Sequence, residues 1–270
     1  MNLYEIEMKA NELNIKYPSL KKMLVIIAIV ELLPGLSSID YSSMWGYVLL
    51  GVILLTATFS HGTYVITKKV ISNEELEGKE QYEGIKRIKE LFMTYLLRGT
   101  IADVILIGGV AIIEFGAQIF FKDALVLMMD PSLVSQYDAS ILSQLWLFLF
   151  YYIGLVIAVF IFGIIFSISI SMVPYVVEYQ KIYNFKALKE SMRLMKGHKR
   201  EYVKMYLSFI FYYIVIGLVM IICNTIFVSI PLLGTALGMI IGMIIEVNTF
   251  YPNLMIREAL FYKKLVELKR

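Results

Sequence analysis

The chain has 270 residues, of which 59% are hydrophobic and 17% charged, and its mean hydropathy is +0.73. These values lie outside the range of soluble domains, and the apolar residues fall in long uncharged blocks that are typical of membrane-spanning helices. The formal net charge of +3 gives no support for nucleic-acid binding, and the single cysteine, Cys223, excludes an intramolecular disulfide and a cysteine metal cluster.

Two apolar blocks follow a polar segment at residues 1–22. The first, residues 23–38, contains Glu31, and the second, residues 44–66, begins beside Trp45 and ends before two lysines. A cleaved signal peptide is disfavoured, because the leading segment carries acidic as well as basic residues and no small-residue cleavage site follows. The two blocks therefore predict spans one and two, joined as a hairpin.

The next segment, residues 67–93, is strongly charged and shows apolar positions at helical spacing in its second half. This pattern predicts an amphipathic helix at the membrane surface. A third span is expected at residues 99–121, with Asp103 and Glu114 inside it. Their separation is close to three helical turns, so both carboxylates point the same way, roughly 16 Å apart along the axis.

An uncharged block of 39 residues, 139–177, is long enough for one tilted crossing or, barely, for two. The basic residues favour one crossing, at 145–177, because the four polar segments with 4, 6, 8 and 5 Lys and Arg residues then lie on one face of the membrane. Two further spans are expected at 205–228 and 232–251, before a polar tail at 252–270. The sequence thus predicts a single all-α membrane domain, a bundle of six transmembrane helices with amphipathic connecting helices and both termini in the cytoplasm.

A motif follows the fourth span. Ala-Leu-Lys-Glu-Ser at 187–191 leads into Met-Lys-Gly-His-Lys at 195–199, with Leu-Ser-Phe at 207–209 and Phe-Tyr at 261–262. These residues resemble those of the bacterial integral membrane proteins grouped as domain of unknown function 975, although the tryptophan-rich opening of that family's fifth span is absent. The resemblance implies six spans in a bacterial cytoplasmic membrane, and it brings no established activity.

The same motif has the pattern of an amphipathic helix. Leu188, Ser191, Met192 and Met195 share one side, and Gly197 is expected to end the helix. The basic side chains point elsewhere: Lys189, Arg193, Lys196, Lys199 and Arg200. Such a helix can lie on the inner leaflet, where each basic side chain gains ~1 kcal/mol near anionic lipid. A docking site for lipid headgroups or for an unidentified protein partner is one interpretation, and the topology favours the alternative, an elbow between two spans.

Ionisable residues inside the expected spans are the next candidates, namely Glu31, Asp103, Glu114 and Glu246. A charge at mid-bilayer costs at least ~2.5 to 3.5 kcal/mol and usually faces a partner or water. One interpretation is a cation or proton path lined by these carboxylates. The other is solvation near the membrane surfaces; the two are balanced for Glu114, and solvation is favoured for the other three.

Gly234, Gly238 and Gly242 repeat every four residues in the sixth span. One face of this helix therefore lacks side chains, and a neighbouring helix can approach closely. Packing within the bundle is favoured over a homo-oligomer seam, which stays open.

No catalytic pattern stands out. His61 and His198 are the only histidines, neither has metal-ligand spacing, and no phosphate-binding loop is present, so we expect no enzymatic activity, metal or cofactor. His61 is expected to be a buried or interfacial polar residue.

The sequence predicts an accessory or scaffold protein that acts through lipids or a protein partner. The alternative is a small transporter or permease whose intramembrane carboxylates line a cation or proton path.

Overall fold

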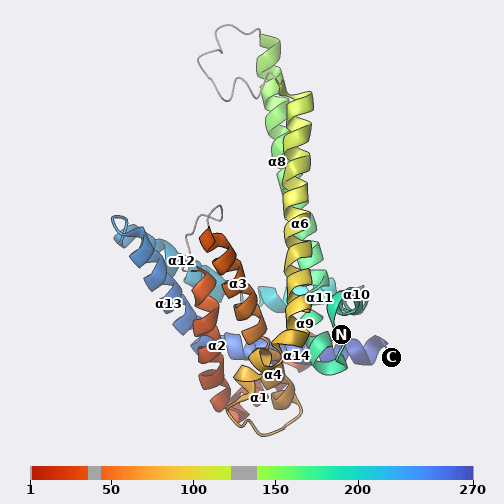
Figure 1. Ribbon diagram of the computed structural model, residues 1–270, viewed down its shortest axis with the longest axis vertical. Coiled ribbons are helices and arrows are strands. Elements are labelled where there is room, and N and C mark those ends of the chain that lie inside the picture. Colours follow the sequence, from red (N-terminus) through yellow and green to blue (C-terminus); the bar gives the residue numbers. More distant parts are fainter. Residues whose placement is uncertain (1, 36–43, 123–138, 270) are drawn as a thin grey trace. The chain divides into compact units, whose positions relative to one another are not determined.

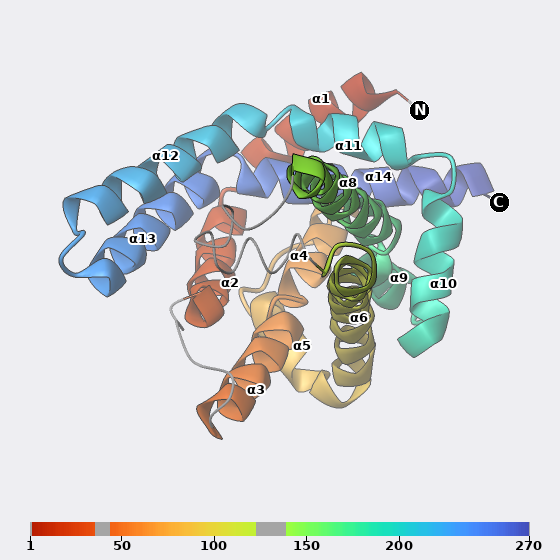
Figure 2. The same ribbon diagram turned by 90° about the horizontal axis from the view of Figure 1, so that it is seen from above.

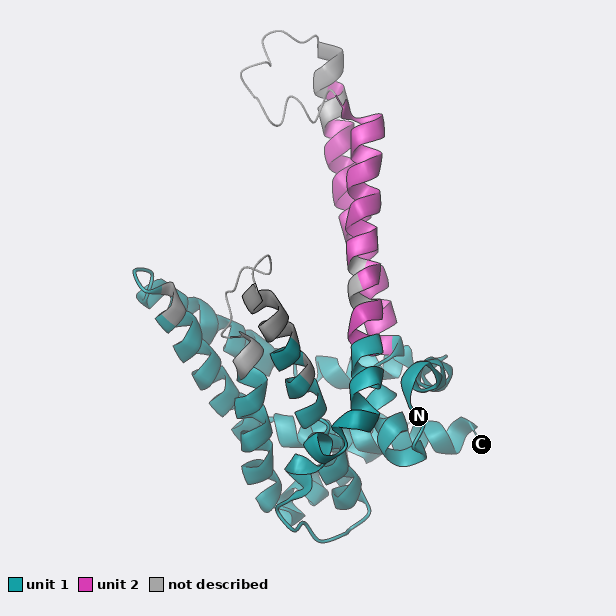
Figure 3. Ribbon diagram, viewed as in Figure 1, with its two compact units in different colours: residues 1–97, 169–270 teal, residues 98–168 magenta. Residues whose placement is uncertain are grey.

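The computed structural model describes residues 2–35, 44–122 and 139–269, and over these residues the chain is helical, without a β-strand. The predicted all-α class is therefore confirmed. The chain divides into two compact units (Figure 3): unit 1 comprises Met1–Leu97 and Ser169–Arg270, and unit 2 comprises Arg98–Ile168.

Unit 1 contains two apolar helical hairpins (Figure 1). In the first, α2 (Ser19–Gly35) packs beside α3 (Met44–Phe59), and in the second, α12 (Ile210–Ile226) packs beside α13 (Pro231–Thr249). Because α13 also packs against α2, the two hairpins are neighbours within unit 1.

The glycine stripe of α13 faces α12. A Cβ atom at Gly234 would lie 2.9 Å from the carbonyl oxygen of Cys223, and one at Gly238 would lie 2.8 Å from Sδ of Met220. A Cβ atom at Gly242 would lie 3.1 Å from a methyl carbon of Ile216. The absent side chains therefore let the two helices of this hairpin approach closely, and the stripe is used within the chain.

Shorter helices form a layer around α14 (Tyr251–Lys269), and we call this the α14 layer (Figure 2). Its other members are α1 (Leu3–Lys16), α4 (Gly62–Ile71), α9 (Val173–Gln180), α10 (Asn184–Met195) and α11 (Lys199–Leu207). Helix α14 contacts α1, α4, α10 and α11, which leaves Ile256, Ala259 and Phe261 fully buried. The tail after the sixth expected span is thus a core element of unit 1.

Helix α10 buries its apolar face inside this layer. Ala187, Leu188, Leu194 and Met195 are each at most 1% exposed, because α10 packs against α9 and α14. Gly197 follows with a φ of +88°, a left-handed conformation that glycine adopts at no steric cost, so the helix ends as expected. The apolar face is therefore occupied by protein, and the charged face of α10 is open to lipid or to a partner, together with Phe185 in its first turn.

Unit 2 consists of the paired segments of α6 (Ile88–Phe120) and α8 (Ala139–Ser169) that lie within residues 98–168. The ring of Phe121 lies 5.5 Å from that of Phe148 and 5.2 Å from that of Tyr151. Large apolar side chains such as Ile107, Phe115 and Phe150 remain more than 60% exposed. An apolar surface of this kind is expected to contact lipid.

Length and hydropathy allow one membrane-crossing stretch without a sharp bend among the described residues, Trp146–Gln180, which comprises most of α8 and all of α9. Two bent pairs also pass when each is taken as one span: Lys199–Leu207 with Ile210–Ile226, bent by 55°, and Leu233–Thr249 with Tyr251–Lys269, bent by 58°. Up to three spans are therefore supported, and they correspond to the fourth, fifth and sixth expected spans. Those at 23–38, 44–66 and 99–121 stay predictions.

Candidate functional site

Glu178 of α9 is a buried carboxylate in unit 1, with a side chain only 5% exposed. Arg87 Nη1 donates to Oε2 at 2.6 Å, while Lys68 Nζ donates to Oε1 at 3.0 Å and Lys181 Nζ at 3.3 Å. Burying an unpaired charge costs several kcal/mol, and hydrogen-bonded cations offset that cost. These ion pairs therefore keep a charged group stable next to the apolar helices.

His61 is a fourth partner of the same carboxylate. The imidazole is fully buried, with Nε2 3.3 Å from Glu178 Oε2 and Nδ1 2.8 Å from the hydroxyl of Tyr95. A carboxylate only accepts hydrogen bonds, so Nε2 carries the hydrogen, and Nδ1 of the neutral ring accepts from Tyr95. His61 is thus the buried polar residue that the sequence predicts.

The donors reach Glu178 from separate segments. Lys68 lies in the last turn of α4, and Arg87 is the C-cap of α5 (Glu83–Lys86). Lys181 is the C-cap of α9 and has a φ of +56°, in the left-handed region that favours glycine. A lysine at this helix end directs its ammonium group back to Glu178, three residues earlier.

The charged segment after α4 contains less helix than the sequence predicts. Helix α4 ends at Ile71, and left-handed residues at Asn73 and Gly78 turn the chain before the 3-10 turn η1 (Glu80–Tyr82), α5 and the start of α6 at Ile88. The expected amphipathic helix over the second half of 67–93 is therefore divided between α5 and α6. Residues with positive φ cannot continue an α-helix, which explains the turn after α4. The division between α5 and α6 lies at Arg87, whose φ of −102° and ψ of 20° depart from helical values.

Glu80 holds this turn in place. Its carboxylate accepts hydrogen bonds from Lys69 Nζ at 2.8 Å and from the backbone N–H groups of Glu77 at 2.9 Å and Lys79 at 3.0 Å. Burial would raise the pKa of Glu80, but the hydrogen bonds from Lys69 and from the backbone outweigh it and lower the pKa to about 2. A second buried carboxylate thus stays charged beside the first.

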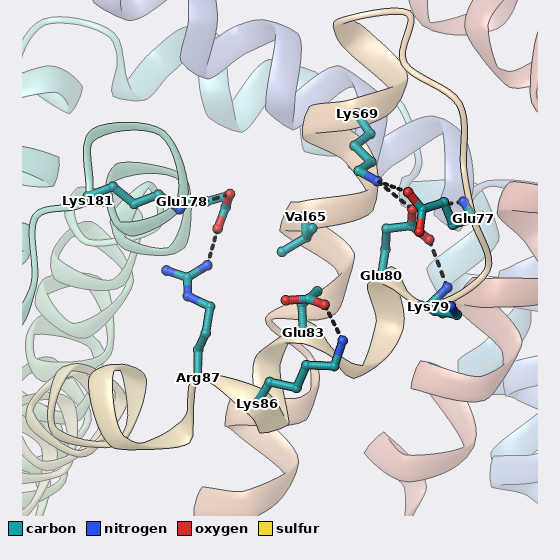
Figure 4. Close-up of a pocket in the computed structure, with 10 residues that line it drawn as sticks. All are labelled: Val65, Lys69, Glu77, Lys79, Glu80, Glu83, Lys86, Arg87, Glu178 and Lys181. Atoms are coloured by element: carbon teal, nitrogen blue, oxygen red, sulfur yellow. Dashed lines mark hydrogen bonds and ion pairs between the residues drawn. The ribbon is translucent and has the colours of Figure 1, made fainter.

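An open pocket of about 360 Å³ lies between these two carboxylates (Figure 4). Glu178, Arg87 and Lys181 line one side, and Lys69 and Glu80 line the opposite side. The remaining lining residues are Val65, Glu77, Lys79, Glu83 and Lys86. Five basic and four acidic side chains therefore meet in one cavity, which suits a small ligand that carries charges of both signs.

A different buried carboxylate lies in the α14 layer. Glu258 accepts hydrogen bonds from the hydroxyls of Tyr202 at 2.6 Å and Tyr175 at 3.3 Å, and a short one from Tyr206. The rings of Tyr202 and Tyr206 lie 4.9 Å apart. This cluster fastens α14 to α9 and α11 and borders none of the pocket described above.

The predicted basic surface is divided between exposed and paired side chains. Lys189, Lys196 and Arg200 are exposed, and Lys199 is half-buried at the start of α11. Arg193 forms a two-pronged ion pair with Glu190, at 2.7 and 2.8 Å. Three cations of this surface, Lys189, Lys196 and Arg200, therefore form no ion pair with the residues that the structure describes.

The four intramembrane carboxylates fall in different places. Glu31 of α2 and Glu246 of α13 both lie in unit 1, on two helices that pack against each other. Glu114 lies in unit 2 with an exposed side chain and no hydrogen bond or ion pair to the described residues. Asp103 belongs to α6, but its side chain lies outside the described part of the chain.

No family model, curated protein or solved structure matches this chain. The resemblance to the domain of unknown function 975 family therefore stays a prediction. The Glu178 cluster was missed at the level of sequence, although Glu178 is the first charged residue after the 39-residue uncharged block. The sequence signal for this cluster is an acidic residue at the end of a long span, Glu178, followed three residues later by Lys181.

Proposed function

We propose that this chain is a non-enzymatic, multi-pass protein of the bacterial cytoplasmic membrane that acts as an accessory or scaffold protein by binding lipid headgroups or a protein partner on the α14 layer. The observation that supports the proposal is the difference between the two faces of α10: the apolar face is buried, whereas Lys189 and Lys196 stay exposed. Because the apolar contacts hold the helix in place, its cations are presented on a fixed surface next to the apolar helices.

Anionic lipid is the occupant that this surface fits best. Lys189, Lys196 and Arg200 carry three positive charges without counter-ions among the described residues, and each basic side chain near an anionic membrane gains ~1 kcal/mol. In the expected topology the segment lies on the cytoplasmic side, where the inner leaflet supplies anionic headgroups. A protein partner with an acidic face would use the same charges and is the other outcome of the test.

The test measures thermal unfolding of the full chain in detergent micelles, with and without phosphatidylglycerol. We expect the anionic lipid to stabilise the wild type and to lose at least half of this effect in the triple variant Lys189→Glu, Lys196→Glu, Arg200→Glu. A matched control reverses three other exposed lysines, Lys9, Lys22 and Lys89. An equal loss in both variants would mean that net charge alone attracts the lipid, and an undiminished response in the first would leave the surface to a protein partner.

A small transporter is the second candidate, and one observation favours it. Glu31 and Glu246 lie on α2 and α13, two helices far apart in the sequence that pack against each other. Two carboxylates inside expected spans are suited to hold a proton or a cation between them.

Flux of protons and of common cations into liposomes tests this candidate. A transporter that uses this pair would lose its flux in Glu31→Gln and in Glu246→Gln, while each variant stays folded. Glu114→Gln tests separately the carboxylate of unit 2. Absence of flux in the wild type would remove the transporter candidate.

A further inference from the structure

The depth of the charged pocket follows from the elements that form it. Val65 and Lys69 lie on α4, the helix that directly follows α3 where the second expected span ends in the structure. Glu178 directly follows the fourth expected span, 145–177. Both spans end on the same side in the expected topology, so the pocket lies at the level where phospholipid headgroups begin.

The basic side chains of the pocket retain unused hydrogen-bond donors. Arg87 has five N–H groups, and its bonds to Glu90, Glu178 and Tyr183 use three of them. Lys86 uses one of its three hydrogens, to Glu83 at 2.6 Å. Arg87 and Lys86 therefore have donors left for a phosphate group, the ligand for which a guanidinium is well suited.

The acidic side chains retain unused acceptors. Oε1 of Glu83 accepts from Lys86, whereas Oε2 accepts no hydrogen bond from the described residues. Glu77 has an exposed carboxylate whose nearest cation, Lys69, is 4.0 Å away. These oxygens are placed to accept hydrogen bonds from a primary ammonium group, and they would repel a ligand that carries only negative charge.

We propose that this pocket binds the phosphoethanolamine headgroup of a phospholipid, with its phosphate at Arg87 and Lys86 and its ammonium group at Glu83 and Glu77. A volume of about 360 Å³ equals that of about twelve water molecules at ~30 Å³ each, which accommodates the eight non-hydrogen atoms of this headgroup together with bridging water. The site rests on the proposed function and deepens it, because it names one lipid class that unit 1 recognises beside the α14 layer.

The hydrogen-bonding groups of the pocket distinguish phosphoethanolamine from two other common headgroups, phosphocholine and phosphoglycerol. A choline headgroup has the phosphate but no N–H group, so it cannot donate to Glu83 or Glu77. A glycerol headgroup has the phosphate but no cation, so it leaves the carboxylates of the pocket uncompensated. Both should bind about tenfold more weakly, the usual effect of losing one charge-assisted hydrogen bond.

The experiment titrates the full chain in detergent micelles with phosphatidylethanolamine, phosphatidylcholine and phosphatidylglycerol, and it follows bound lipid by native mass spectrometry and thermal unfolding. The test variant is the charge-neutral pair Glu83→Gln with Lys86→Gln, whose side chains are 34% and 57% exposed, so that folding is preserved. The matched control is Lys9→Gln with Glu12→Gln, two exposed residues of opposite charge with the same spacing on α1.

We expect the wild type and the control to bind phosphatidylethanolamine about tenfold more tightly than the other two lipids, and the Glu83/Lys86 variant to lose this preference. Equal binding of phosphatidylcholine, tighter binding of phosphatidylglycerol, or an unchanged preference in the Glu83/Lys86 variant would each overturn the assignment. Each titration is repeated in the background of the triple variant Lys189→Glu, Lys196→Glu, Arg200→Glu, where the basic surface no longer binds phosphatidylglycerol, and the preference of the pocket is judged in that background. Failure of the pocket is therefore distinguishable from failure of the basic surface.

Discussion

Glu178 and Glu258 are both buried carboxylates of unit 1, and the chain stabilises them with different partners. Glu178 is held by lysine and arginine side chains from α4, the α5 C-cap and the α9 C-cap. Glu258 is held by the hydroxyls of Tyr175, Tyr202 and Tyr206. Long cationic chains leave an open pocket beside the first, whereas packed rings close the space around the second.

The two sets of partners suit a buried carboxylate to different roles, ligand binding at Glu178 and helix packing at Glu258. Lysine and arginine side chains have many rotamers, and their spare donors can be shared with a ligand. A tyrosine hydroxyl sits on a rigid ring and supplies one donor, so the Glu258 cluster fixes α14 without offering a binding site. We therefore expect the first cluster to respond to ligand and pH, and the second to respond mainly to loss of packing.

The largest effect is expected at Glu178. Glu178→Gln keeps the size of the side chain but leaves the cations of Arg87 and Lys68 clustered without their counter-ion, which should lower the free energy of unfolding by about 3 kcal/mol. Denaturation in mixed micelles measures this change. Glu75→Gln, at an exposed position, is the control and should stay within about 0.5 kcal/mol of the wild type. A comparably small loss at Glu178 would show that the cluster contributes little to stability.

A smaller effect is expected in the tyrosine cluster. Tyr206→Phe removes one of three hydroxyl donors to Glu258 and should cost about 1.5 kcal/mol, the usual value for a hydrogen bond to a charged group. Tyr212→Phe removes a hydroxyl for which the described residues supply no hydrogen bond, and it should be nearly neutral. A loss at Tyr206 as large as at Glu178 would erase the distinction between the two clusters.

The smallest effect is a pH dependence at Glu80. Its pKa is about 2 in the folded chain and about 4.3 in an unfolded chain, so the folded state binds this proton more weakly. The stability that results is complete above pH ~4.3 and is lost as the pH falls towards 2. We expect a loss of about 1 kcal/mol over this window, reduced because Lys69 is partly exposed to solvent. Glu80→Gln should lack this part of the slope; an identical pH profile in the variant would contradict the assignment.

Much of the helical organisation follows from local pattern. The apolar blocks predict the hairpins, Gly197 predicts the end of α10, and the four-residue glycine spacing predicts a close helix contact. The sequence also predicts the apolar side of α10, from Leu188 and Met195, but it leaves open what covers that side, which in the structure is protein. Periodicity identifies an apolar face and carries no information about what covers it.

The Glu178 cluster could not be assembled from sequence. Its partners His61, Lys68 and Arg87 lie 117, 110 and 91 residues away, and no local rule joins positions so far apart. The turn after α4 was missed for a local reason, because Asn73 and Gly78 punctuate a run of charges that was interpreted as one segment.

The long sequence separations between Glu178 and its partners also mean that the cations are synthesised well before the carboxylate. Ribosomes add about 5 to 20 residues per second, so Arg87 emerges on the order of ten seconds before its counter-ion, 91 residues later. During this interval Arg87 can pair with Glu90 of its own segment, whereas Lys68 has no ion-pair partner among the described residues other than Glu178, and anionic headgroups are the nearest substitute for that partner. The nascent first hairpin is therefore expected to lie on the lipid surface until α9 leaves the insertion machinery and Glu178 pairs with Lys68 and Arg87.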